Sequence, residues 1–469
     1  MNAAGEPAAA RELPGSDMRI AHGEWQDDSR RRGGGLSSIL ATGSPCTGSV
    51  IQYEPVALEI DMEQRFTRMK FVMSTALIAG GLGACASEDT SALGSAEDAV
   101  QRQQFAGHVY AMTNSPDGNA IIHYGRRGNG QLVQLSTTLT MGIGSGFLEV
   151  PDLTTLTADP LQSQQALRLT ADHRFLMGVN TIDHTIAVFR VGRDGELELT
   201  DVQDSGGLFP NTIGEHDDLV YVGNIGNPPI GVAGNVTGFR LLPNGHLIPI
   251  PSSTRQLSNP AISLPAHALF SKDGDRLVVS DLFAEELDVF PVLPSGRLGS
   301  PTITHSAGPH PLGMIFGKHD DLLVSESGET EGSSVSSYQL RGTRLDVVSA
   351  SVPNGQAGGC WLSITPDGRF AFSGNTFAPG NVSTYAVNGR GELTLAVAAG
   401  AERTPDPRVG STAPLDSFVT ADGRYFYQHF GGLGVVGAFT IGRDGVLTAI
   451  PDGDGLGLPF VGSQGLDGF

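Results

Sequence analysis

The stretch Thr365-Pro366-Asp367-Gly368-Arg369-Phe370 decides the fold, because an Asp-Gly turn leads there into a strand of alternating side chains, Ala371–Asn375. Asp and Gly accept the backbone angles that a tight hairpin needs. Related turns with the same continuation occur at Thr170–Phe175, Ser271–Arg276 and Thr420–Tyr425. The sequence therefore repeats one β-hairpin along most of its length.

Two further landmarks recur with this hairpin. A second turn precedes a leucine at Gly128–Leu132, Arg193–Leu197, Pro243–Leu247, Pro294–Leu298, Arg341–Leu345, Gly389–Leu393 and Arg443–Leu447. The intervals between these leucines are 65, 50, 51, 47, 48 and 54 residues. A strand ending in an aromatic residue recurs at Ile186–Phe189, Val236–Phe239, Leu287–Phe290, Val335–Tyr338, Val382–Tyr385 and Val436–Phe439. Four strands in about 50 residues are the size of one propeller blade.

These seven units predict an all-β fold, a seven-bladed β-propeller of four-stranded blades over residues 105–469. The alternative is a β-sandwich with accidental repeats, which the near-constant spacing argues against. The first unit begins at His108–Asn114 and matches a second strand, so its inner strand is missing. Ser463–Leu466 resembles the inner-strand start Ser163–Leu167. We expect the C-terminal strand to complete the first blade and close the ring, which removes free strand edges.

Composition agrees with many short strands and restricts the partners. Among 469 residues there are 64 glycines and 28 prolines, only 17 % are charged, and the net charge is −21. Nucleic acid is an unfavourable partner, because phosphate binding needs clustered Lys and Arg. An anionic membrane surface would be repelled as well, so membrane attachment requires an anchor. The three cysteines, Cys46, Cys85 and Cys360, show neither metal-ligand spacing nor a disulfide framework.

The segment Met69–Cys85 resembles a bacterial lipoprotein signal. It has a basic start, about a dozen apolar residues and the ending Leu82-Gly83-Ala84-Cys85, which is similar to a lipobox. The apolar run is too short to span a bilayer as a helix; the alternative is a buried apolar segment. We predict a signal peptide at 62–85, lipidation of Cys85 and a flexible tether at 86–104. Residues 1–61 are interpreted as a spurious product of an over-extended start codon or a disordered extension. The expected location is outside the cytoplasm, lipid-anchored at the cell envelope (periplasm or outer membrane) or secreted.

The repeats resemble the lactonase family of seven-bladed propellers, which includes 6-phosphogluconolactonase-like and carboxymuconate-cyclising enzymes. The resemblance covers Phe105 to Phe469 and rests on the turns quoted above and their order. The family's inner-strand histidine, preceded by proline, corresponds to His267 in Pro265-Ala266-His267. The family's glutamate and arginine have no counterpart, because Asp281 is followed by leucine, and Asn180 and Asn375 by threonine. The resemblance therefore implies a lactonase-like protein with an incomplete family site.

In a propeller, the starts of the inner strands and the ends of the second strands meet at one mouth of the central channel. Lactone opening needs a base for water, donors for the developing oxyanion and a surface that holds the ring. We therefore predict a catalytic set of His267 as base with Asp281, Glu326 and Asp416. The predicted substrate-binding set is Trp361, Asn180, Asn224 and Asn375. The alternative is that these polar side chains only hydrogen-bond the strand ends around a water-filled channel.

Two functions remain open from the sequence. The first is hydrolysis of a neutral lactone at the cell envelope, neutral because none of the predicted mouth residues is basic. The second is a non-enzymatic envelope propeller that binds a protein, a glycan or a small molecule; cycloisomerisation of an acidic lactone is a weaker third. We expect no cofactor, no metal and a monomer. The Gly-x-Ser-x-Gly, His-Glu-x-x-His and Gly-Lys-Ser/Thr motifs of other hydrolases and NTPases are absent from the sequence.

Overall fold

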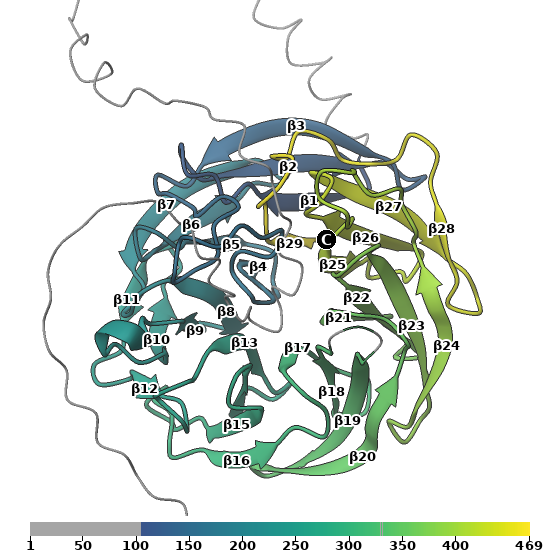
Figure 1. Cartoon of the computed structure of the whole chain (residues 1–469). Coiled ribbons are helices and arrows are strands. Elements are labelled where there is room, and N and C mark those ends of the chain that lie inside the picture. Colours follow the sequence, from purple (N-terminus) through teal and green to yellow (C-terminus); the bar gives the residue numbers. More distant parts are fainter. Residues whose placement is uncertain (1–104, 329, 331) are drawn as a thin grey trace, which may run out of the picture. The chain divides into compact units, whose positions relative to one another are not determined.

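A computed structural model describes residues 105–328, 330 and 332–469, which form seven antiparallel sheets arranged as a ring around one axis (Figure 1). The predicted all-β, seven-bladed propeller is confirmed. The predicted signal peptide with Cys85, the tether and the extension before them lie outside the described residues. In the part of the chain that is described, no helix is both long and apolar enough to cross a membrane.

Each blade is written from its innermost to its outermost strand. Blade 1 holds β29 (Leu466–Gly468), β1 (Gly107–Met112), β2 (Ala120–Arg126) and β3 (Leu132–Leu139). Blade 2 holds β4 (Leu167–Leu169), β5 (Phe175–Asn180), β6 (Thr185–Val191) and β7 (Leu197–Asp204). Blade 3 holds β8 (Pro210–His216), β9 (Leu219–Asn224), β10 (Asn235–Leu241) and an outer strand in two pieces, β11 (Leu247–Pro249) and β12 (Arg255–Gln256). The 3-10 helix η2 (Pro228–Ile230) lies between β9 and β10.

The remaining four blades follow the same order. Blade 4 holds β13 (Pro265–Phe270), β14 (Arg276–Asp281), β15 (Glu286–Pro291) and β16 (Thr302–His305). Blade 5 holds β17 (Pro311–Phe316), β18 (Asp321–Glu326), β19 (Ser334–Arg341) and β20 (Arg344–Pro353). Blade 6 holds β21 (Gly359–Ile364), β22 (Phe370–Asn375), β23 (Asn381–Val387) and β24 (Leu393–Gly400). Blade 7 holds β25 (Pro414–Val419), β26 (Tyr425–Phe430), β27 (Val435–Ile441) and β28 (Leu447–Ala449).

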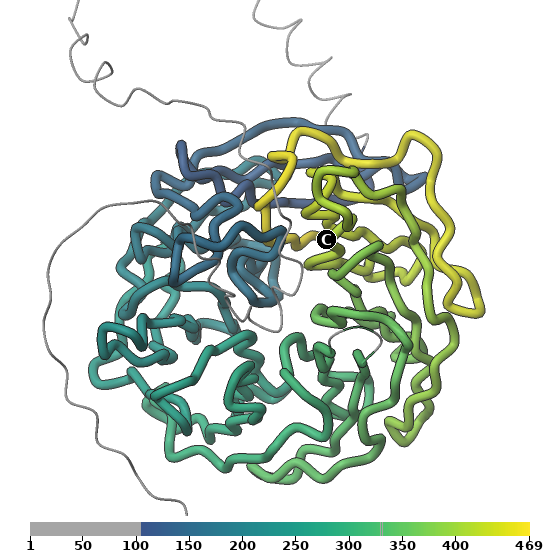
Figure 2. The backbone as a smooth tube through the Cα atoms, in the orientation of Figure 1, coloured from purple at the N-terminus to yellow at the C-terminus, as the bar shows by residue number. Residues whose placement is uncertain are grey.

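The ring closes through the C-terminal strand, as predicted. β29 pairs antiparallel with β1, with Leu466 opposite Ala111 and Gly468 opposite Val109. His108 and Phe469 exchange two backbone hydrogen bonds of 2.9 and 2.8 Å beyond this register. The tube in Figure 2 shows the two ends of the described chain meeting in the same sheet. First and last strands thus share one blade, and neither leaves a free edge.

The hairpin turns have the local chemistry that the sequence predicts. Gly368 and Gly195 adopt φ angles of +74° and +79°, which side chains with a Cβ rarely tolerate. In four blades the Thr or Ser that opens the first turn donates its hydroxyl to the Asp two residues on, as Thr365 does to Asp367 at 2.7 Å. These turns are stabilised by residues that are close in sequence, so they could be predicted from the sequence alone.

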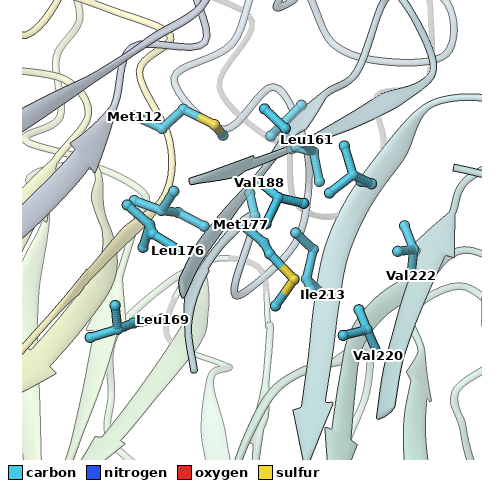
Figure 3. Close-up of a cluster of buried hydrophobic side chains, with 14 of the residues drawn as sticks. Met112, Leu161, Leu169, Leu176, Met177, Val188, Ile213, Val220 and Val222 are labelled. Atoms are coloured by element: carbon cyan, nitrogen blue, oxygen red, sulfur yellow. The ribbon is translucent and has the colours of Figure 1, made fainter. Parts of the chain in front are cut away.

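The core consists of apolar side chains packed between neighbouring blades. Figure 3 shows one such cluster, in which Met177 of β5 and Ile213 of β8 lie between the sheets of blades 2 and 3. Both side chains are fully buried, and so are Val220 and Val222 of β9. Each sheet carries apolar side chains on both faces, because every blade packs against a neighbouring blade on either side.

Candidate functional site

The ends of the second strands lie at the mouth face, the face that also carries the loops leading into the inner strands. Asn180, Asn224, Asp281, Glu326, Asn375 and Phe430 are each the last residue of the second strand of a blade. Asn114 follows β1 by two residues. The placement predicted for these residues along the strands is therefore correct, but the channel between the blades is occupied.

The occupant is the segment of residues 161–165, here called the channel segment, which leads into β4. Gln164 N donates to Ala266 O of β13 at 3.0 Å, and Ile213 N of β8 donates to Gln165 O at 3.0 Å. The tube in Figure 2 shows the chain before β4 reaching toward the centre of the ring. Inner strands expose unpaired N–H and C=O groups toward the axis, and the channel segment satisfies some of them.

Side chains complete this closure. The Gln164 amide donates Nε2 to Leu362 O and accepts from Leu362 N, both at 2.9 Å, on β21. Its Oε1 lies against Gly313 of β17, where a Cβ would stand only 2.2 Å away. Ser163 O accepts from Gln464 Nε2 at 2.8 Å, just before β29. The channel segment also bonds β8 of blade 3, β13 of blade 4 and, from Gln165 N to Asp416 Oδ1, β25 of blade 7. This segment, which belongs to blade 2, therefore touches all six other blades.

His267, the predicted base, lies on β13 next to Ala266 and is completely buried. Its Nδ1 accepts from Met314 N at 3.0 Å, and its Nε2 has no hydrogen-bond partner among the described residues. Burial, and secondarily the Arg168 charge, lower the pKa of His267 to about 3, so the imidazole is neutral. The channel segment bonds Ala266, the neighbour of His267, and also Leu362, which corresponds in strand register to Ala268, so it lies alongside His267.

Asp416 and Trp361 meet the same segment. Asp416 Oδ1 accepts from Gln165 N at 2.9 Å, and Trp361 Nε1 donates to Ser163 O at 3.0 Å. Both side chains are buried, Trp361 with 1 % of its surface exposed. Burial raises the pKa of Asp416 to about 7. The structure thus brings His267, Asp416 and Trp361 together around the channel segment.

The two other predicted catalytic carboxyls serve local hydrogen bonds. Glu326 accepts from Gly308 N at 2.8 Å and from the hydroxyls of Ser334 and Ser336. Asp281 Oδ1 accepts from Leu264 N at 3.0 Å, and burial raises the pKa of this carboxyl. Both fasten the end of a second strand to the loop that enters an inner strand, each within its own blade.

The three predicted amides also make hydrogen bonds to neighbouring polar side chains. Asn180 Oδ1 accepts from Thr140 Oγ1 at 2.6 Å, Asn224 Nδ2 donates to Asn235 Oδ1 at 3.1 Å, and Asn375 Nδ2 donates to Asn381 Oδ1 at 2.7 Å. All three side chains are buried. For these residues the hydrogen-bonding alternative describes the contacts that the structure contains.

A hollow of about 640 Å³ opens at the mouth face beside the channel segment. Its wall comes from the loops β1–β2, β22–β23, β24–β25 and β28–β29 and from the long insertion between β3 and β4. The apolar part of this wall includes Phe147, Leu156, Phe377, Val409 and Phe460. A volume of 300–1,000 Å³ is usual for small-molecule sites, so the hollow is a candidate binding site.

One carboxyl in this wall, Asp159, is almost fully buried, with 1 % of its surface exposed. Its Oδ1 accepts from Gln162 N at 3.1 Å, while its Oδ2 makes no hydrogen bond of normal geometry among the described residues. Burial, followed by the charges of Glu149 and Asp416, raises the pKa of Asp159 well above its ordinary value; hydrogen bonds from Gln162 N and the Gln464 side chain oppose this shift. The raised pKa favours the protonated form, in which the carboxyl is a hydrogen-bond donor.

Sequence reasoning missed both Asp159 and the channel segment. The signal was the 65-residue interval between Leu132 and Leu197, against 47–54 residues elsewhere. The extra length is the insertion between β3 (Leu132–Leu139) and β4 (Leu167–Leu169). It has no strand periodicity, so nothing local indicated that it enters the channel. The described residues contain no group of three or more His, Cys, Asp or Glu side chains suited to a metal ion.

The fold is a seven-bladed propeller, and solved structures share it. A 6-phosphogluconolactonase-like protein from Bacteroides fragilis superposes with a TM-score of 0.59 at 17 % identity, covering 77 % of this chain and 97 % of its own. A periplasmic gluconolactonase from Pseudomonas aeruginosa gives a TM-score of 0.57 at 17 % identity, with 77 % and 98 % covered. At such identity the likeness shows the fold alone. No protein-family model and no curated protein matches the sequence.

Proposed function

We propose that this propeller hydrolyses a neutral lactone at the cell envelope, with the substrate bound in the mouth-face hollow. The observation that carries the proposal is the buried carboxyl of Asp159, whose Oδ2 has no hydrogen bond of normal geometry among the described residues, in the wall of a hollow of about 640 Å³. A neutral carboxylic acid can donate to the lactone where negative charge develops. The lactonase-type fold and the lipobox-like sequence ending at Cys85 support the substrate class and the location.

The reaction needs one water and no external reagent. The water oxygen adds to the carbonyl carbon, the bond from that carbon to the ring oxygen breaks, and a hydroxy acid results. Asp159 donates its proton to the leaving ring oxygen and recovers one from the water that has added. Asp416 acts through Asp159 as a positioning residue, because its charge contributes to the raised pKa of the Asp159 carboxyl. A general acid of this kind contributes about 10²–10⁴-fold to the rate.

The test is a panel of γ-butyrolactone, δ-valerolactone and glucono-δ-lactone with the full chain. We expect Asp159→Asn to lower kcat/KM about 10²-fold or more. The matched control is Asp217→Asn, a carboxyl whose side chain is 88 % exposed in the β8–β9 turn. His267→Gln is the decisive comparison: loss of activity there, with Asp159→Asn still active, would assign the base role to His267 and remove Asp159 from the mechanism.

Binding without turnover is the second candidate, and one observation favours it. The channel segment packs against the strand that carries His267, through the bond from Gln164 N to Ala266 O, and the His267 side chain is completely buried. The predicted base therefore cannot meet a ligand at the mouth while this segment stays in place. No hydrolysis of any lactone in the panel, together with measurable binding of one, would establish this second function, with a small molecule rather than a protein or glycan as the ligand.

A further inference from the structure

The mouth-face hollow differs in chemistry from a site for sugars or phosphates. Its one lining cation among the described residues, Arg408, is already engaged. Arg408 donates to both oxygens of Asp406 at 2.9 and 2.8 Å, and its guanidinium lies 4.1 Å from the centre of the Phe460 ring. An anionic substrate would therefore find no uncompensated positive charge in this wall.

Hydroxyl-rich ligands are disfavoured for a second reason. The wall presents side chains such as Phe147, Leu156 and Phe460, and these are 48, 44 and 38 % exposed in the structure. Hydroxyls of a sugar lactone buried against them would lose water without gaining partners, and each unpaired polar group costs free energy. An alkyl chain instead gains from removing this apolar surface from water.

The wall also contains polar residues, and the hydroxyls of Thr113, Thr376 and Ser411 among them already donate within the protein. Asp159 follows Leu156 by three residues in the same insertion and leads directly into the channel segment. In its protonated form a carboxyl can donate one hydrogen bond to a carbonyl group. A ligand with one polar group and an apolar remainder matches Asp159 and the apolar part of the wall.

We propose that the hollow takes the alkyl substituent of a neutral lactone, with the lactone carbonyl at Asp159 and the alkyl chain against Phe147, Leu156 and Phe460. This inference rests on the proposed lactone substrate and specifies its class: an alkyl lactone rather than a sugar lactone or a phosphorylated one. Each methylene that enters the hollow contributes about 0.8 kcal/mol, which is about fourfold in affinity or in kcat/KM.

The test measures binding and turnover separately on the full chain. Binding is measured by calorimetry with the unreactive lactam analogues of γ-butyrolactone, γ-hexalactone and γ-decalactone. Hydrolysis is measured with the lactones themselves. We expect affinity to rise about fourfold per methylene until the hollow is filled. Leu156→Ser lowers affinity for the longest analogue about tenfold. The control Ile303→Ser, at a residue 49 % exposed on β16 of blade 4, leaves the chain-length series unchanged.

The outcomes separate the two proposals. Affinity that rises with chain length supports the alkyl site. If affinity rises in this way but no lactone is hydrolysed, the alkyl site stands and the proposed hydrolase activity is refuted. Hydrolysis with no dependence on chain length, or with glucono-δ-lactone preferred, overturns the alkyl site and leaves the hydrolase intact. Equal effects of Leu156→Ser and Ile303→Ser also overturn it, because the chain then binds elsewhere.

Discussion

Replacing Gln164 by alanine tests whether the channel segment holds the ring together. The substitution keeps the backbone bond to Ala266 but removes both side-chain bonds to Leu362, each of 2.9 Å and fully buried. Leu362 N and O are then left without these partners, and an unsatisfied buried group costs about 1–3 kcal/mol. The sum is about 2–6 kcal/mol, a large part of the 5–15 kcal/mol typical of a folded domain.

The assay is thermal unfolding of the full chain at neutral pH. With about 2.1 cal/mol/K of unfolding entropy per residue, a domain of this length loses about 1.3 °C in Tm per kcal/mol, so we expect Gln164→Ala to lower Tm by about 3–8 °C. Gln134→Ala, which removes an exposed 3.3 Å bond to Thr137 on β3, is the matched control and should change Tm by about 1 °C. Gln164→Met keeps most of the volume and separates packing from hydrogen bonding. Equal Tm values for Gln164→Ala and Gln134→Ala would refute a stabilising role of the segment.

Three further predictions follow from the closure, the buried imidazoles and the signal. Deleting residues 462–469 removes β29 and its pairing with β1; we expect aggregation in size-exclusion chromatography, and a soluble product of unchanged Tm would contradict closure by this strand. His108 Nδ1 and His123 Nε2 lie 2.8 Å apart, and burial lowers the pKa of each ring to about 4. The stability that these neutral rings contribute is therefore complete above pH 6.5 and is lost as the pH falls toward 4. The variant with both histidines replaced by glutamine should lose less Tm between pH 7 and 4.5 than the wild type. Cys85→Ser should abolish a lipid modification visible by mass spectrometry of membrane-extracted protein, and an unmodified wild-type product that begins before Met62 would contradict export.

The predictable part of the site is its geometry along each blade. Asn224, Asp281 and Glu326 could be assigned to second-strand ends because turns and alternation are set by residues within about ten positions. What those side chains do could not be predicted. Glu326 binds Ser334 and Ser336 of its own blade, and nothing in a local pattern distinguishes such a carboxylate from one that faces a ligand.

The sequence by itself determined the number of blades, their strand order and the closure by the C-terminal strand, because Asp-Gly turns and strand alternation are local properties. Only the tertiary structure decided what fills the axis. Apart from the local bonds of Gln162 to Asp159, Glu149 and Val150, the channel segment is held by partners between 48 and 303 positions away, from Asn211 to Gln464. Contacts at such separations depend on how seven sheets pack around the axis. Which carboxyls line the hollow, Asp117 and Asp159 rather than Asp281, follows from that packing.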